Sequence, residues 1–98
     1  MKLWCQDKVV AQQIRKHRVN ERYLPGVFID EKIKPVTDLS EAICDSQWVF
    51  ESTPVQYLRS VLRQTKHCFN KNQIWVILSK GIEQDTLCFP SQIIDDVF

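Results

Sequence analysis

Glycine is scarce in this 98-residue sequence, and long apolar runs are missing from it. The two glycines, Gly26 and Gly81, stand far apart, so the chain contains no G-x-G-x-x-G loop of the kind that holds a phosphate group. No apolar run approaches the roughly 18 residues that a membrane-spanning helix requires. The N-terminus carries one lysine and no apolar run long enough for a signal peptide. We therefore expect a cytoplasmic protein without a membrane partner.

A surplus of charge of either sign is also absent. Thirteen basic and twelve acidic residues give a net charge of +1, so we expect no nucleic-acid partner. The hydrophobic fraction of 44% is ordinary for a soluble globular chain, and the length allows one domain at most.

The cysteine pattern matches no common metal site. Cys5, Cys44, Cys68 and Cys88 are widely spaced, and no C-x-x-C occurs. His67 and Cys68 are adjacent, and neighbours cannot easily place both side chains on one metal ion, so we expect no metal site. An even cysteine count is compatible with two disulfides in a secreted protein, but the absence of a signal peptide favours free thiols. No nucleophile–base pair indicates cysteine catalysis.

Short apolar runs alternate with helical patterns along the chain. Strands are expected at 3–5, 34–37, 48–52 and 74–78, and helices at 8–17, 39–44, 55–64 and 86–97. Pro90 indicates that the regular part of the last helix begins near that residue, and Pro35 favours an edge strand. A polar loop is expected at 66–72. The run 74–78 should be the most buried strand. The alternation predicts the α/β class with a parallel sheet.

The most informative stretch follows the last expected strand. Trp75 to Leu78 is apolar and is followed by Ser79, Lys80 and Gly81. A lysine at the carboxyl end of a buried strand lies where open α/β sheets bind their ligands. Its ammonium group suits a phosphate or a carbonyl oxygen. The alternative is a surface turn, which is the usual interpretation of a Lys-Gly dipeptide taken alone.

Several segments carry a resemblance to one enzyme family. They are K-L-W-C-Q-D at 2–7, N-E-R-Y-L-P-G-V at 20–27, W-V-F-E-S-T-P at 48–54, V-L-R-Q at 61–64 and S-K-G-I-E at 79–83. In this order they resemble the bacterial type of NAD(P)-dependent glycerol-3-phosphate dehydrogenase. That family exchanges hydride between NAD(P)H and dihydroxyacetone phosphate, giving glycerol 3-phosphate for phospholipid synthesis.

The resemblance implies a partial Rossmann-like parallel sheet with flanking helices that lacks the first βα unit. Residues 1–98 would then form a single partial NAD(P)-binding domain, without the glycine-rich loop and without the C-terminal substrate domain. The family's catalytic lysine lies in that substrate domain, so we expect no catalytic residue here and no catalysis by this chain alone.

The same resemblance implies where NAD or NADP would touch the chain. Gln6 follows the first expected strand, where the family often has a basic residue facing the NADP phosphate; Gln6 cannot supply that charge, which weakens the case for NADP. Thr53 and Pro54 open the helix after strand 48–52, although a plain capped helix start is the alternative. Lys80 is expected to contact both cofactor and substrate. Glu51 is unusual, because a lone carboxylate in an apolar strand is costly unless it is paired.

The missing first strand has a further implication. In the Rossmann strand order it lies between the strands expected here at 3–5 and 48–52, so their backbone edges would be open. Open edges invite association, and we expect marginal stability and self-association through the exposed sheet edges. The alternative to an enzyme segment is an interaction module, or a remnant, that pairs with a complementary chain.

Overall fold

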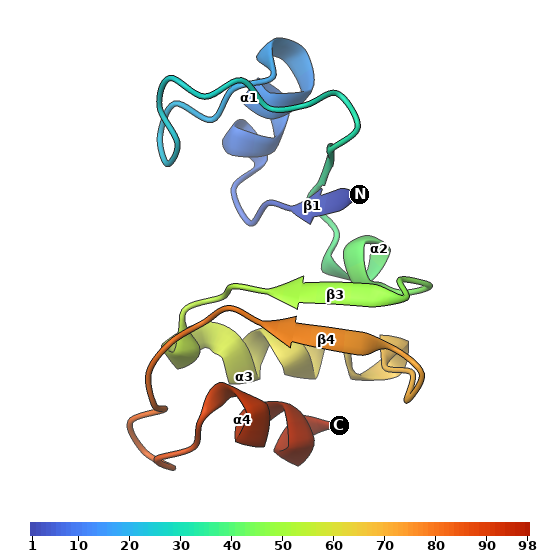
Figure 1. Ribbon diagram of the computed structural model, residues 1–98, viewed down its shortest axis with the longest axis vertical. Coiled ribbons are helices and arrows are strands. Elements are labelled where there is room, and N and C mark those ends of the chain that lie inside the picture. The colour runs from blue at the N-terminus through green and yellow to red at the C-terminus, as the bar shows by residue number, and fades with distance from the viewer. The chain divides into compact units, whose positions relative to one another are not determined.

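The computed structural model describes residues 1–98, which divide into two compact units, Met1–Ala42 and Ile43–Phe98. The elements follow the order β1 (Lys2–Trp4), α1 (Lys8–His17), β2 (Lys34–Val36), α2 (Leu39–Ile43), β3 (Trp48–Glu51), α3 (Val55–Gln64), the 3-10 helix η1 (Lys66–Cys68), β4 (Ile74–Ile77) and α4 (Pro90–Val97) (Figure 1). Parallel strands alternate with helices, which confirms the predicted α/β class.

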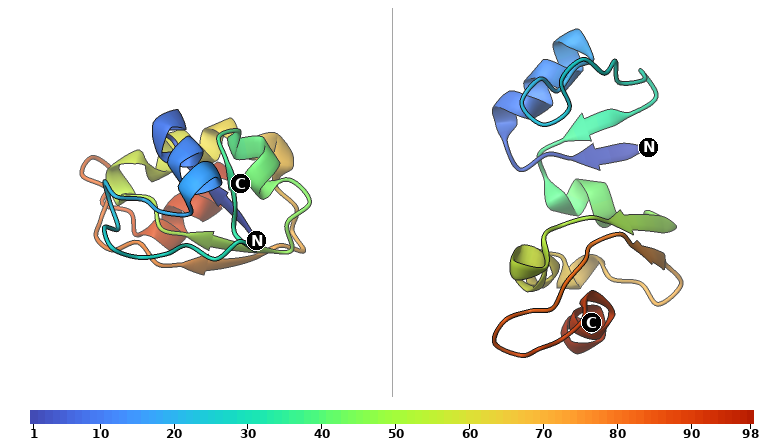
Figure 2. Two further views of the ribbon diagram at one scale, coloured as in Figure 1. Left: turned by 90° about the horizontal axis from the view of Figure 1, so that it is seen from above. Right: turned by 60° about the vertical axis from the view of Figure 1, so that its left-hand side comes forward.

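The first unit is a parallel pair of strands with one helix against it. β1 pairs with β2 from Lys2 opposite Lys34 to Trp4 opposite Val36 (Figure 2). α1 begins after Asp7, whose carboxylate accepts a hydrogen bond from the Val9 N–H at 2.8 Å. The core of this unit consists of Cys5, Val10, Ala11, Ile14 and Ile29.

The second unit repeats this plan with two helices. β3 pairs with β4 in parallel, from Trp48 opposite Ile74 to Glu51 opposite Ile77. α3 and α4 pack together, and Trp75 of β4 lies against their shared core (Figure 1). That core consists of Val55, Leu58, Leu62, Ile93 and Val97. The helix expected at 55–64 is therefore confirmed, with one side buried in this core.

β4 is not the deeply buried strand that its composition predicts. Ile74 is 44% exposed and Ile77 is 37% exposed. The physical reason is that β4 has β3 as its single strand partner, so the sheet is too narrow to enclose it. Trp48 and Phe50 of β3 are also exposed, and their rings stack with centroids 6.5 Å apart. The β3–β4 sheet thus presents apolar side chains to solvent.

Two segments differ from the predicted elements. The expected polar loop 66–72 contains η1, which forms because the Cys68 N–H bonds to the Thr65 carbonyl at 2.8 Å. The last helix is shorter than the expected range 86–97 and begins at Pro90, as the proline indicates; the Gln92 side chain accepts from the Phe89 N–H at 2.8 Å.

No helix of the structure has both the length and the apolar character needed to cross a bilayer.

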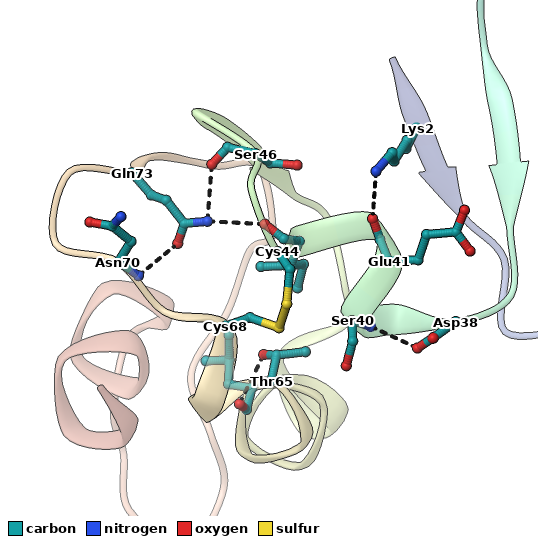
Figure 3. The surroundings of a disulfide bond; sticks show 12 residues. Lys2, Asp38, Ser40, Glu41, Cys44, Ser46, Thr65, Cys68, Asn70 and Gln73 are labelled. Atoms are coloured by element: carbon teal, nitrogen blue, oxygen red, sulfur yellow. Dashed lines mark hydrogen bonds between the residues drawn. A yellow bond between two sulfur atoms is a disulfide. The ribbon is translucent and has the colours of Figure 1, made fainter.

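A disulfide joins Cys44 to Cys68 (Figure 3). The prediction of free thiols is therefore wrong for this pair, whereas Cys5 and Cys88 are free. The two half-cystines are 24 residues apart in sequence, yet their Cα atoms are 4.8 Å apart, within the range that a disulfide needs. Sequence spacing did not show this proximity, because it depends on the parallel pairing of β3 and β4, which brings the segments before the two strands together.

Candidate cofactor site

The turns after β3 and β4 lie side by side in the second unit. The two strands are parallel and in register, so both end at the same edge of the sheet. The Leu78 N–H continues the ladder by donating to the Glu51 carbonyl at 2.8 Å. Thr53 and Pro54 follow one strand and Lys80 follows the other. The structure therefore brings these three predicted residues onto neighbouring turns.

Glu51 joins the two turns. Its side chain is buried, with the residue only 5% exposed. One carboxylate oxygen accepts from the Thr53 N–H at 2.5 Å, and the other accepts from the Ser79 hydroxyl at 2.6 Å. These charge-assisted hydrogen bonds offset the cost of burying the carboxylate. Glu51 is therefore a bridge between the Thr53 turn and the Lys80 turn.

Lys80 is exposed at the surface of its turn, and no hydrogen bond or ion pair within the chain engages its ammonium group. Gly81 follows with φ +98°, a conformation that side chains disfavour. A Cβ atom at Gly81 would make an ordinary van der Waals contact with a methyl group of Val55, at 3.5 Å, so the backbone conformation alone favours glycine here. The glycine thus lets the chain turn sharply over the start of α3 and leaves Lys80 available to an anionic ligand.

The start of α3 is not capped by a side chain. Pro54 is the N-cap residue and makes no side-chain hydrogen bond. Thr53 is held through its own N–H by Glu51. No side chain caps this helix start, and a contact of Thr53 and Pro54 with a cofactor stays a prediction. The Tyr57 N–H donates to the Pro54 carbonyl at 2.9 Å, and the N–H groups of Val55 and Gln56 lie at the positive end of the helix dipole.

Gln6 belongs to the first unit, where it is exposed just after β1. The neighbouring Asp7 caps α1, and its other carboxylate oxygen pairs with Arg22 at 3.0 Å. Both Asp7 oxygens are thus engaged within the protein. Gln6 is an exposed polar side chain beside this engaged carboxylate, and its contact with a cofactor stays a prediction.

The sequence interpretation missed an ion-pair network that anchors the Lys80 turn. Glu83 closes the S-K-G-I-E segment, and its carboxylate accepts from two nitrogens of Arg59 in α3, at 3.0 and 3.1 Å. Arg59 also pairs with Asp96 of α4, and Thr86 donates to Glu83. The side chains of Arg59 and Glu83 are only 15% and 13% exposed. The sequence showed an acidic residue at the end of the S-K-G-I-E segment. It did not show that Arg59 is the partner of this residue.

This network should make the second unit sensitive to acid. The hydrogen bonds from Arg59, and then from Thr86, hold the pKa of Glu83 below its ordinary value. A depressed carboxyl pKa stabilises the fold above the unfolded-state pKa of about 4.3, and that stabilisation is lost as the pH falls through the folded-state pKa. We expect the urea midpoint to fall between pH 5 and 3, and to fall less in Glu83→Gln.

The comparison for this pH experiment is a variant of an exposed acid. Glu31 is exposed and lies in the other unit, so Glu31→Gln should keep the full pH dependence. Equal pH dependence in wild type and Glu83→Gln would contradict a role for the Glu83 carboxylate.

A second cluster of reactive side chains lies elsewhere in this unit. The ligand atoms of Cys44, His67 and Cys68 are all within 4.8 Å of one another. The expectation that adjacent His67 and Cys68 cannot easily place both side chains on one metal ion stays a prediction, although the structure brings their ligand atoms close together. The tight turn of η1 lets neighbouring residues face the same place, which an extended chain would not allow.

The known proteins that match this chain decide its family. The sequence profile described as "NAD-dependent glycerol-3-phosphate dehydrogenase N-terminus" matches residues 1–98. The chain belongs to this family. It is 36% identical over 94 residues to glycerol-3-phosphate dehydrogenase (NAD(P)+) of Bacillus licheniformis, covering 96% of this chain and 27% of that protein. The enzyme of the same name from Carboxydothermus hydrogenoformans is 36% identical over 95 residues, covering 97% and 28%.

Solved structures confirm the Rossmann-type fold of this glycerol-3-phosphate dehydrogenase segment. DsGPDH of Dunaliella salina superposes with a TM-score of 0.87 at 20% identity, covering 98% of this chain and 18% of that one. Glycerol-3-phosphate dehydrogenase of Coxiella burnetii gives 0.85 at 18% identity, covering 97% and 29%. The chain spans about a quarter of the length of the curated relatives described above.

The glycerol-3-phosphate dehydrogenase family implies a nicotinamide dinucleotide, and the residues described here fit part of one. Exposed Lys80 offers a cation for a phosphate or carbonyl oxygen, and the uncapped start of α3 offers N–H donors. The glycine-rich loop that grips the pyrophosphate in Rossmann domains is not among these residues.

Proposed function

We propose that this chain is a cofactor-binding segment of a glycerol-3-phosphate dehydrogenase. The whole enzyme would reduce dihydroxyacetone phosphate to glycerol 3-phosphate, a phospholipid precursor, with NADH or NADPH. The observation that carries the proposal is the exposed, unpartnered Lys80 on a turn fixed by Glu51 and Gly81. In this proposal residues 1–98 form one partial domain of a cytoplasmic enzyme, the compartment expected from the sequence.

Each predicted residue has a role in this proposal. Lys80 holds the cofactor and a phosphate or carbonyl oxygen of the substrate, Thr53 and Pro54 shape the start of α3, and Gln6 faces the adenosine ribose. Gln6 brings no positive charge for a 2′-phosphate, which favours NAD over NADP. The nicotinamide supplies the hydride, and this chain alone supplies binding groups and no catalytic residue.

Titration of the 98-residue chain with NADH tests the proposal. Energy transfer from its three tryptophans to the bound dihydronicotinamide should show saturable binding. Lys80→Ala should weaken that binding about 10- to 100-fold, because a hydrogen bond to a charged group is worth about 1.5–3 kcal/mol. Displacement by NAD+ would show that the nicotinamide dinucleotide itself is recognised.

A lysine outside the site provides the matched control for this titration. Lys71 is an exposed residue of the loop between η1 and β4, and Lys71→Ala should bind NADH like the wild type. Equal loss in both variants would indicate nonspecific attraction of the anion. No saturable binding by the folded wild-type chain would overturn the proposal for this segment, while its family membership would stand.

A second candidate is an interaction module that associates through its sheets, with another copy or a complementary chain. β1 and β3 each pair with one strand, and Phe50 of β3 is 58% exposed. Sedimentation velocity should show a dimer as the concentration rises, and Phe50→Lys should restore the monomer. Tyr57→Lys, an exposed site on α3, is the control. A monomer at every concentration would contradict self-association.

A further inference from the structure

The sulfur and nitrogen atoms of three potential ligands converge beside the Cys44–Cys68 disulfide. Cys44 follows α2, while His67 and Cys68 belong to η1, and their ligand atoms lie within 4.8 Å of one another. A tetrahedral zinc ion with Zn–S bonds of about 2.3 Å holds two thiolates about 3.8 Å apart. The sulfurs of a reduced pair would therefore need to separate by about 2 Å from their disulfide distance.

Hydrogen bonds hold the loops of the two cysteines together independently of the disulfide (Figure 3). The Gln73 side-chain amide donates to the carbonyls of Ile43 and Ser46, each at 3.0 Å. Its amide oxygen accepts from the Asn70 N–H at 3.2 Å. Gln73 thus clamps the segment that carries Cys44 to the loop that follows Cys68. Reduction of the disulfide would leave this clamp in place, so the ligands would remain preorganised.

The cluster is open to an ion from solvent. A cavity of about 410 Å³ is lined by Cys44, Asp45, His67 and Cys68, among others. His67 is exposed and Cys44 is half-buried. The Asp45 carboxylate adds negative charge at the cavity wall. Cys68 is buried at the inner side of the cavity, so a cation would enter past the His67 imidazole and the Cys44 sulfur.

We propose that reduced Cys44 and Cys68, together with His67, form a redox-controlled site for Zn²⁺ or a similar soft divalent ion. Two thiolates and an imidazole are ligand types that zinc prefers, and three protein ligands leave a fourth position for water. The disulfide is the metal-free, oxidised state of the same site. This site is separate from the turn that carries Lys80.

The change between the two states balances with a dithiol as the reductant. The dithiol gives two electrons and two protons to the S–S bond and itself becomes a disulfide, leaving Cys44 and Cys68 as thiols. The metal ion then displaces both thiol protons into solvent, and two S–metal bonds and one N–metal bond form. Transfer of two electrons from the thiolates to a disulfide oxidant restores the S–S bond and releases the ion.

Cobalt(II) titration of the full 98-residue chain tests the site. The chain is reduced with a dithiol, freed of the reagent without oxygen and titrated with Co²⁺. We expect one Co²⁺ per chain, with thiolate-to-cobalt charge-transfer absorption and the visible bands of tetrahedral Co²⁺, and displacement by Zn²⁺. The oxidised chain should show neither absorption.

Single substitutions identify the ligands. Substituting a residue that only supports a metal ligand costs about 10- to 100-fold in metal affinity. Loss of a ligand itself, in Cys44→Ser, Cys68→Ser or His67→Asn, should therefore lower the Co²⁺ affinity by at least about 100-fold. Cys88→Ser removes a free thiol outside the cluster and should leave the Co²⁺ affinity unchanged.

Three results would overturn the proposal. The first is a reduced chain that keeps its circular dichroism spectrum but binds no Co²⁺, which would make the pair a structural disulfide only. The second is unchanged Co²⁺ affinity in His67→Asn. Because His67 is exposed, this variant should fold and remain a valid test even if Cys44→Ser or Cys68→Ser does not fold. The third is unfolding of the wild-type chain on reduction, because the Gln73 clamp would then be insufficient to hold the ligands.

Discussion

Replacing Glu51 with leucine should lower the free energy of unfolding of the second unit by about 2–4 kcal/mol, because two polar partners lose their acceptor. The Thr53 N–H and the Ser79 hydroxyl both donate to this carboxylate in a partly buried setting. Leucine fills the space but accepts no hydrogen bond. Urea unfolding followed by tryptophan fluorescence measures the loss, provided that the transition is two-state.

Milder substitutions distinguish the contribution of the Glu51 hydrogen bonds from that of the volume of its side chain. Glu51→Gln keeps an oxygen for the Thr53 N–H and should lose about half as much stability, since its hydrogen bonds are no longer charge-assisted. Ser79→Ala removes one donor and should cost about 1 kcal/mol. The exposed control Glu31→Gln should stay within about 0.5 kcal/mol of the wild type. If Glu51→Leu also stays within that limit, the bridge does not stabilise the turns.

Leu58→Ala should have the largest effect, with a loss of about 3–5 kcal/mol in the free energy of unfolding. Leu58 of α3 is fully buried, at 0% exposure, in the core that α3 shares with α4. Truncation removes contacts with Ile93 of α4 and leaves a cavity that a small core cannot easily fill. Because domains of this size are only marginally stable, the second unit should unfold at low urea.

The neighbouring residue on α3 is the control for this substitution. Tyr57 is 66% exposed, so Tyr57→Ala keeps the same helix but removes little buried surface, and its effect should be about 0.5 kcal/mol. Similar losses in the two variants would mean that helix propensity, rather than core packing, determines the stability. That result would contradict the assignment of Leu58 to the core.

Local patterns predicted the elements well where the signal lies within a few residues. Pro90 marked the start of α4, and the helices expected at 8–17 and 55–64 coincide with α1 and α3. Caps, prolines and helical periodicity act over one or two turns, so a single sequence contains them completely. The family and fold followed from ordered motifs, and the comparisons confirm both.

The sequence did not predict features that depend on contacts between distant residues. How deeply the side chains of β4 are buried depends on the number of strands beside it, and no local run of residues shows that number. The partners of Glu51 and Glu83 lie 28 and 24 residues away, at Ser79 and Arg59 respectively. It stays a prediction that a nicotinamide cofactor contacts Gln6, Thr53, Pro54 and Lys80.

The disulfide attaches the two turns of the proposed site in different ways. The covalent ring from Cys44 to Cys68 encloses β3 and α3, and with them the Thr53 turn, but β4 lies outside it. The Lys80 turn is therefore joined to the ring by non-covalent contacts, namely the β3–β4 pairing, the hydrogen bonds of Glu51 with Leu78 and Ser79, and the ion pair of Glu83 with Arg59. Oxidation would constrain the Thr53 turn covalently, whereas the position of the Lys80 turn would still depend on these non-covalent contacts.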